Sequence, residues 1–160
     1  MSDDSKEGAP QTPRVLFLCT GNACRSQMAE GWLRHLAGAQ VTSLSAGTEP
    51  HGLNPRAVAA MADAGVDISM QTSDSLADYL GDPPELVIAV CSHAADNCPL
   101  LPGATSLLRW PFPDPAPGGV DEGVDEEEIR ARFQSVRDAI RDKISSWLAD
   151  GAAPLHLPRA

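Results

Sequence analysis

The chain has 160 residues, the length of one ordinary domain, and 42% of them are hydrophobic, enough to form a buried core. Its net charge of −10 argues against partners such as nucleic acid or an anionic membrane surface, so an anionic substrate would need a local site. The acidic start MSDDSKEGAPQTP is unlike a signal peptide, and no apolar run reaches the roughly 18 residues that span a bilayer. We therefore expect a cytoplasmic protein, most simply a monomer, whose four cysteines are reactive or metal-binding thiols.

Strands and helices alternate along the chain. Apolar runs predict strands at 14–19, 41–46, 86–91 and 106–109, and helical spacing predicts helices at 26–38, 54–65, 75–80 and 125–150. Asn54 has the character of an N-cap, Pro55 of a first helical residue and Gly65 of a helix stop. This order predicts an α/β fold: a single-domain, parallel four-stranded sheet with helices on both faces. The folded domain is expected at 14–150, between mobile tails at 1–13 and 151–160.

The turn between the first strand and the first helix has the composition of an anion site. Ligands of open α/β sheets bind at the carboxyl ends of strands, where the next helix presents free N–H groups and a positive dipole end. Gly21 and Asn22 tolerate the positive φ that a loop wrapped around an oxyanion requires. The predicted oxyanion-binding residues are Thr20, Gly21, Asn22, Ala23, Cys24, Arg25 and Ser26.

Cys19 lies where this site would stabilise a thiolate. A helix N-terminus and a nearby cation favour the charged form of a cysteine, so Cys19 is predicted to be a nucleophile at neutral pH. Arg25 would grip two oxygens of the anion, and Ser26 could donate a hydrogen bond to the sulfur. A buried cysteine at a strand end is often inert packing, but the Cys-x5-Arg-Ser context favours the reactive interpretation. The loop lacks the Gly-Lys-Ser/Thr ending of a nucleotide-binding loop.

The segment CTGNACRS resembles the phosphate-binding loop of the low-molecular-weight protein tyrosine phosphatase superfamily. Three features, over a likeness that spans about 13–150, narrow the resemblance to the thioredoxin-coupled arsenate reductases. CSHAADNC places Cys91 and Cys98 where those reductases carry a redox pair, and GNACRS carries their extra Cys24. WPFPDPA places Asp114 where the superfamily carries its catalytic acid, although Ala116 replaces the aromatic residue typical of the phosphatases.

Chemistry then indicates how arsenate could be told from phosphate. Both are tetrahedral oxyanions, so binding alone separates them poorly. Attack by Cys19 would form a thiol–arsenate adduct, with Asp114 protonating the departing oxygen and with Trp110 and Phe112 expected to shield that carboxyl from water. Cys91 could then attack Cys19 and expel arsenite, a reduction that phosphorus does not undergo. The resemblance implies that Cys98 next attacks Cys91 and that thioredoxin reduces the resulting pair.

Motion is needed for the last thiol exchange. A regular helix would hold the Cα atoms of Cys91 and Cys98 about 10 Å apart, whereas a disulfide needs roughly 4.4 to 6.8 Å. We therefore expect the segment between them to loop or unwind on oxidation.

Other interpretations of these residues stay open. A low-molecular-weight tyrosine phosphatase would need Cys19, Arg25 and Asp114 alone, and a non-catalytic thiol module could bind arsenite or a metal. Cys91, His93 and Cys98 could be zinc ligands, although their spacing fits no common zinc motif.

Cys24 is expected to be mainly structural, and the remaining expectations concern small ligands. The resemblance implies a possible potassium site at Asn22, Glu30, Ser45 and Asp74, and each of these residues also has an ordinary capping or surface explanation. No tightly bound cofactor is expected, and phosphate and sulfate should compete with arsenate.

Overall fold

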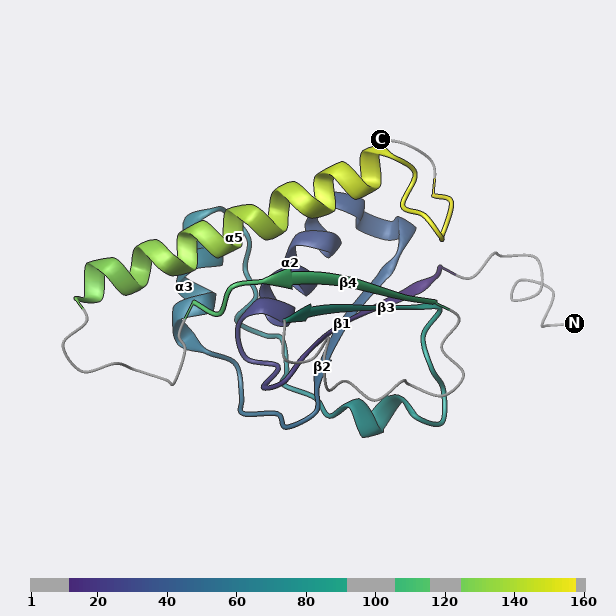
Figure 1. The fold of residues 1–160 in the computed structure, drawn as a ribbon, viewed down its shortest axis with the longest axis horizontal. Helices are drawn as coiled ribbons and strands as arrows, with labels where there is room; N and C mark the ends of the chain where they lie inside the picture. The colour runs from purple at the N-terminus through teal and green to yellow at the C-terminus, as the bar shows by residue number, and fades with distance from the viewer. Residues whose placement is uncertain (1–11, 92–105, 116–124, 158–160) are drawn as a thin grey trace, which may run out of the picture.

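Four parallel strands form one sheet in the order β2-β1-β3-β4 (Figure 1). The computed structural model describes residues 12–91, 106–115 and 125–157. The strands are β1 (Arg14–Cys19), β2 (Thr42–Gly47), β3 (Leu86–Cys91) and β4 (Ser106–Phe112). All lie where the sequence predicts them, and β4 continues to Phe112, beyond the expected end at residue 109. The predicted single-domain α/β architecture is confirmed.

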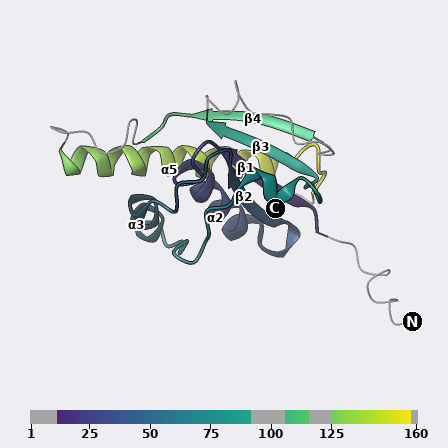
Figure 2. The ribbon, with the colours of Figure 1, turned by 90° about the horizontal axis from the view of Figure 1, so that it is seen from below.

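The helices are α2 (Arg25–Ala37), α3 (Pro55–Asp63) and α5 (Glu126–Ala149), with two short 3-10 helices, η1 (Gly38–Gln40) and η2 (Leu76–Tyr79). The start of α3 has the predicted cap, since Asn54 Oδ1 accepts a hydrogen bond from the Arg56 amide at 2.8 Å. Figure 2 shows α2 and α3 together on one side of β3 and β4. Within the described residues the α-helices share one core with the sheet, and η2 covers the opposite face through Leu76.

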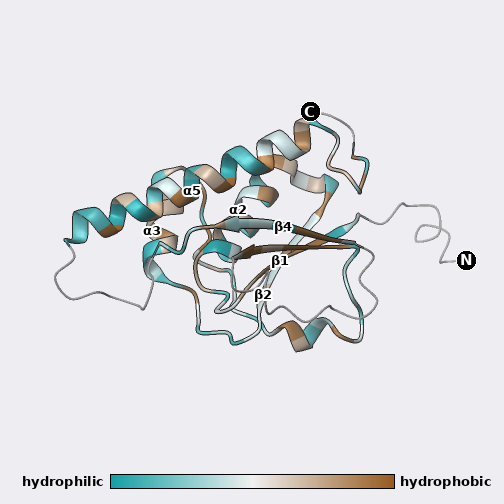
Figure 3. Cartoon of the chain, viewed as in Figure 1, coloured by the Kyte–Doolittle hydropathy of each residue, from teal (hydrophilic) through white to brown (hydrophobic). Residues whose placement is uncertain are grey.

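The strands are largely hydrophobic along their length, and α5 alternates between hydrophobic and hydrophilic residues (Figure 3). Buried residues of the sheet and of α5 belong to one hydrophobic core. Phe17 of β1 is fully buried, and so are Ile140 and Ile144 on the predicted apolar face of α5. Burying side chains of this size stabilises the fold by roughly 1.5 to 3 kcal/mol each. The core thus fixes the sheet against α2 and α5.

The C-terminal segment differs from the expected tail over residues 151–157. Ala152 is fully buried, its amide donates to the Trp147 carbonyl at 2.8 Å, and Trp147 Nε1 donates to the Ala153 carbonyl at 2.8 Å. The segment therefore lies against the end of α5. At the other end of the chain, residues 1–11 of the expected tail at 1–13 lie outside the described residues, and the Pro13 carbonyl accepts a hydrogen bond from the Thr42 amide at 2.9 Å.

The carboxyl ends of the strands meet at one edge of the sheet. Cys19 is paired in register with Gly47 of β2, and Cys91 is paired with Phe112 of β4. Leu18 is paired with Ala89, so β1 and β3 end side by side. The fold thus brings the ends of all four strands to the edge where the sequence predicts an anion site.

Among the described residues, no helix has the length and apolarity to span a membrane.

Candidate active site

The loop between β1 and α2 turns its carbonyl groups outward. Three of them accept hydrogen bonds from amides of the segment 49–54: Thr20 from Glu49 and Gly21 from His51, both at 2.8 Å, and Ala23 from Asn54 at 3.1 Å. Across a trans peptide the C=O and the next N–H point in opposite directions. The amides that follow these carbonyls are therefore turned toward the inside of the loop, as in an anion-binding nest.

Gly47 lets β2 approach this loop closely. A Cβ atom there would lie 2.6 Å from the Thr20 carbonyl oxygen and 2.9 Å from the Asn22 nitrogen. Both are backbone atoms of the loop, which could move only by deforming it. Glycine is therefore required at the end of β2 if the loop is to keep its shape.

Asn22 is the bend of the loop, with φ of 46° and a fully buried side chain. Holding a residue other than glycine in this conformation costs on the order of 1 kcal/mol. The side chain offsets that cost, because Nδ2 donates to Ser26 Oγ at 2.8 Å and Oδ1 accepts from the Asp74 amide at 2.7 Å. The predicted positive φ at position 22 is thus present.

Cys19 lies against Ser26, with Sγ 2.9 Å from Oγ, and its exposed fraction is only 3%. Ser26 Oγ already accepts the Asn22 amide, and its single proton remains to be placed. A thiolate has no proton, so the hydroxyl must donate to the sulfur when Cys19 is ionised. This hydrogen bond and the start of α2 both stabilise the negative charge of a thiolate.

Arg25 joins the loop to the end of β4. Its Nη1 donates to the Phe112 carbonyl at 3.0 Å, and its Nη2 lies 3.9 Å from Asp114 Oδ2. The structure thus places Asp114 beside the residues of the anion loop. The expected shielding of its carboxyl is not seen, because the side chain is 40% exposed and Trp110 packs instead against Phe17 and Trp147.

Cys24 is the N-cap residue of α2, and its side chain makes no capping hydrogen bond. Burial raises the pKa of the Cys24 thiol to about 12, and the nearby Asp114 and Cys19 act in the same direction. Cys24 is therefore a neutral thiol at physiological pH, a state that suits a structural residue.

The four residues implied for potassium form two contacts. Ser45 Oγ donates to Glu30 Oε1 at 2.6 Å, while Asn22 Oδ1 is occupied by the Asp74 amide. Burial raises the pKa of Glu30, and hydrogen bonds from Ser45 and the Arg34 guanidinium act against that shift. Arg34 forms an ion pair with Glu30, so this carboxylate already has a cation beside it. In this arrangement Ser45 and Arg34 contact the Glu30 carboxylate, and the Asp74 amide contacts Asn22 Oδ1.

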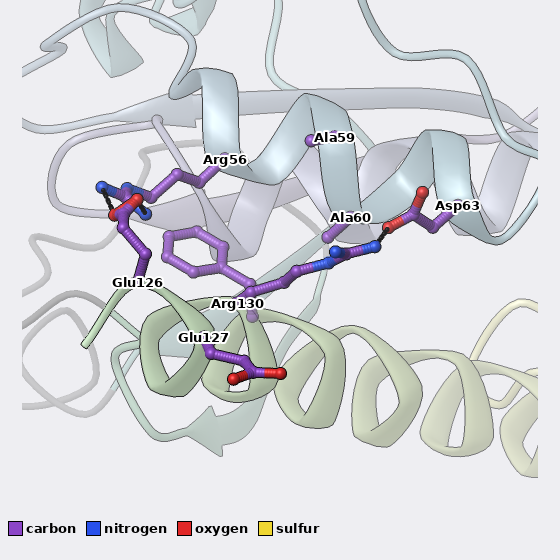
Figure 4. Close-up of a pocket in the computed structure, with 8 residues that line it drawn as sticks. Arg56, Ala59, Ala60, Asp63, Glu126, Glu127 and Arg130 are labelled. Carbon is purple, nitrogen blue, oxygen red and sulfur yellow. Dashed lines mark hydrogen bonds and ion pairs between the residues drawn. The ribbon is translucent and has the colours of Figure 1, made fainter.

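A hollow of about 570 Å³ lies between α3 and α5 (Figure 4). Two ion pairs cross it, Arg56 with Glu126 and Arg130 with Asp63. None of the residues predicted for the site lines this hollow, so we place the site at the loop.

Part of the predicted thiol relay lies outside the described residues. Cys98 and His93 fall in 92–105, and for Cys91 the backbone alone is described, at the end of β3. Within the described ranges, no group of three His, Cys, Asp or Glu side chains could hold a metal ion. Sequence reasoning missed Gln27, whose buried amide bonds the loop, because no spacing or motif marks a single glutamine as a support.

Comparisons with known proteins agree with this geometry. The family described as low molecular weight phosphotyrosine protein phosphatase matches residues 14–153. The arsenate reductase of Halalkalibacterium halodurans is 47% identical over 137 residues, which cover 86% of this chain and 96% of that protein. A solved arsenate reductase in the phosphate-binding state is 30% identical with a TM-score of 0.62, covering 84% of this chain and 98% of that one. The thioredoxin-dependent arsenate reductase of Corynebacterium glutamicum is 31% identical with a TM-score of 0.61, and the match covers 89% of this chain and 65% of that one. From the loop, the sheet and these relatives together, the chain belongs to the low molecular weight phosphotyrosine protein phosphatase family, in its arsenate reductase branch.

Proposed function

We propose that this protein reduces arsenate to arsenite with Cys19 as the nucleophile. The observation that carries the proposal is the 2.9 Å contact between Cys19 Sγ and Ser26 Oγ at the foot of a loop whose carbonyls face outward. Such a site can bind a tetrahedral oxyanion next to a sulfur to which the Ser26 hydroxyl can donate a hydrogen bond. The 47% identity to an arsenate reductase supports arsenate as the substrate.

The first step joins sulfur to arsenic. The amides of the loop and Arg25 hold three oxygens of arsenate, and the fourth faces Asp114. Cys19 attacks the arsenic of monoprotonated arsenate, the bond from arsenic to the hydroxyl breaks, and the departing hydroxyl takes a proton from Asp114 and leaves as water. The exposure of Asp114 allows solvent to return that proton after each turnover.

The second step transfers two electrons. The Cys91 thiolate attacks the sulfur of Cys19, and the S–As bond breaks with its electron pair moving to arsenic, which leaves as arsenite. The product is a disulfide between Cys19 and Cys91. The parallel pairing of β1 and β3 supports this order, since both cysteines end their strands at the same edge of the sheet.

The third step restores Cys19. The Cys98 thiolate attacks Cys91, which releases the Cys19 thiolate and leaves a disulfide between Cys91 and Cys98. We propose thioredoxin as the dithiol that reduces this pair, in keeping with the thioredoxin-dependent relative from Corynebacterium glutamicum. A relay of free thiols requires a reducing compartment, so the cytoplasm remains the expected location.

The geometry of the site also predicts which anions compete with arsenate and whether potassium is needed. Phosphate and sulfate have the tetrahedral shape of arsenate, so we expect both to compete for the loop. We propose that Arg34, through its ion pair with Glu30, supplies the positive charge that potassium would otherwise bring. No step of the reaction is routed through potassium.

A phosphatase is the second candidate, because Arg25 Nη2 lies 3.9 Å from Asp114 Oδ2, and an aryl phosphate would also need an arginine and an acid at one site. Both reactions start with attack by Cys19, and the thiols Cys91 and Cys98 serve the reductase alone. Aryl phosphate hydrolysis is therefore expected as a weak side activity that is lost with Cys19.

Purified protein with thioredoxin, thioredoxin reductase and NADPH tests the proposal. We expect arsenate-dependent NADPH oxidation with matching arsenite release, and we expect a folded Cys19→Ser variant to show neither. Ser43→Ala is a matched control, because it removes a largely buried serine hydroxyl that does not contact Cys19. Vigorous aryl phosphate hydrolysis without arsenite formation would favour the phosphatase instead.

A further inference from the structure

We infer that Gln27 is a positioning residue, which holds the anion loop in its binding conformation through hydrogen bonds made in the protein interior. Gln27 follows Ser26 in α2, and its exposed fraction is 0%. Its Nε2 donates two hydrogen bonds, one to the Asn22 carbonyl and one to the Thr72 carbonyl, both at 2.9 Å. A single amide group thus ties the bend of the loop to the segment 71–74.

The orientation of this amide is fixed by a second glutamine. Gln71 Nε2 donates to Gln27 Oε1 at 2.8 Å and to the Gln27 carbonyl at 3.0 Å. Both protons and the oxygen of the Gln27 amide are therefore engaged, and a flipped amide would oppose its oxygen to two carbonyl oxygens. Burial without unsatisfied groups makes this arrangement rigid.

The consequence for the loop follows from the peptide that joins residues 22 and 23. With the Asn22 carbonyl held by Gln27, the Ala23 amide is turned the opposite way, toward the inside of the loop. The same bond restrains the left-handed backbone of Asn22, whose side chain donates to Ser26. Gln27 thus helps to fix the hydrogen bond between Ser26 and Cys19, because it holds Asn22, which contacts Ser26.

Ser73 gives this carbonyl a second donor, with Oγ at 3.0 Å from the Asn22 oxygen. Ser73 belongs to the surrounding segment, whereas Gln27 belongs to the helix that carries Arg25 and Ser26. Gln27 therefore fixes the bend of the loop relative to the residues that grip the anion. A methionine at position 27 would keep the length and burial of the side chain but remove both donors.

The test compares Gln27→Met with wild type in three measurements: inhibition by inorganic phosphate, the kcat and KM for arsenate, and phosphate protection of Cys19 from iodoacetamide. We expect the inhibition constant for phosphate and the KM for arsenate to rise roughly 5- to 30-fold, as for loss of a buried hydrogen bond. Ser43→Ala is the control, because Ser43 is largely buried and its Oγ donates to the Glu30 carbonyl, away from the loop, so phosphate inhibition should stay at the wild-type value. Gln71→Met removes the donor that orients the Gln27 amide and should change phosphate inhibition in the same direction as Gln27→Met.

These readouts separate positioning from packing. If Gln27 only fills space, a folded Gln27→Met protein keeps wild-type phosphate inhibition and KM, and that result overturns the inference. If Gln27→Met does not fold, Gln27→Leu removes the same two donors and should likewise raise the inhibition constant for phosphate. Unchanged phosphate inhibition in folded Gln27→Leu would then overturn the inference.

The inference rests on the proposed role of Cys19 and the loop, and the protection assay keeps the two questions apart. Phosphate must first protect Cys19 of the wild-type protein. Failure of that protection would refute the anion site itself and the role of Gln27 with it. Protection in wild type together with equal protection in Gln27→Met would refute the role of Gln27 alone.

Discussion

Replacing Ser26 with alanine removes the hydroxyl that lies 2.9 Å from Cys19 Sγ. A hydrogen bond to a charged group contributes roughly 1.5 to 3 kcal/mol. Since about 1.4 kcal/mol corresponds to a factor of ten, the rate at which Cys19 is alkylated at neutral pH should fall by roughly 10- to 150-fold. The substitution also leaves Asn22 Nδ2 without its acceptor, so some loss of stability should accompany the loss of reactivity.

The rate of Cys19 alkylation by iodoacetamide, followed by peptide mass spectrometry at neutral pH, measures this effect. Ser43→Ala is the control, because Ser43 is also largely buried and its Oγ donates to the Glu30 carbonyl at 2.9 Å, away from Cys19. Its alkylation rate should stay at the wild-type value. A folded Ser26→Ala protein that alkylates as fast as wild type would refute the argument that Ser26 stabilises the thiolate.

Three further outcomes follow from the site. Because burial raises the pKa of Cys24 to about 12, this residue stays protonated at mildly alkaline pH. Limited iodoacetamide should therefore label Cys19 ahead of Cys24, and preferential labelling of Cys24 in peptide maps would contradict this. Asp114→Asn should lower kcat by roughly 10²- to 10⁴-fold with little change in phosphate inhibition, and an unchanged kcat would remove the general acid. Exchanging potassium for sodium should alter kcat/KM by less than about twofold while Arg34 pairs with Glu30, and a strong potassium requirement would show that the ion pair does not serve in its place.

The strands and helices could be predicted because their signals are local. The apolar run of β1, the Asn54-Pro55 start of α3 and the apolar face of α5 all lie within a few residues of one another in sequence. The Cys-x5-Arg-Ser spacing likewise located the loop. The geometry of the loop could not be predicted, because its carbonyls are held by the segment 49–54, about thirty residues away in the chain.

Two other differences have the same origin in tertiary packing. Residues 151–157 follow the end of α5 and show no helical or strand pattern, yet Ala152 is buried and its amide donates a hydrogen bond to the Trp147 carbonyl. Asp114 follows an aromatic stretch in sequence, but β4 directs Trp110 into the core and leaves the carboxyl exposed. In each case neighbours in space, rather than neighbours in sequence, decide the exposure of the side chain.

The most direct test of reduction by a thiol relay is the amount of arsenite formed by fully reduced protein without any external reductant. The relay predicts one arsenite per chain, both for wild type and for Cys98→Ser, because Cys19 and Cys91 suffice for the first turnover. Cys91→Ser should form none, since the adduct on Cys19 then has no attacking thiol. One arsenite per chain from Cys91→Ser, or none from the wild-type protein, would contradict the account.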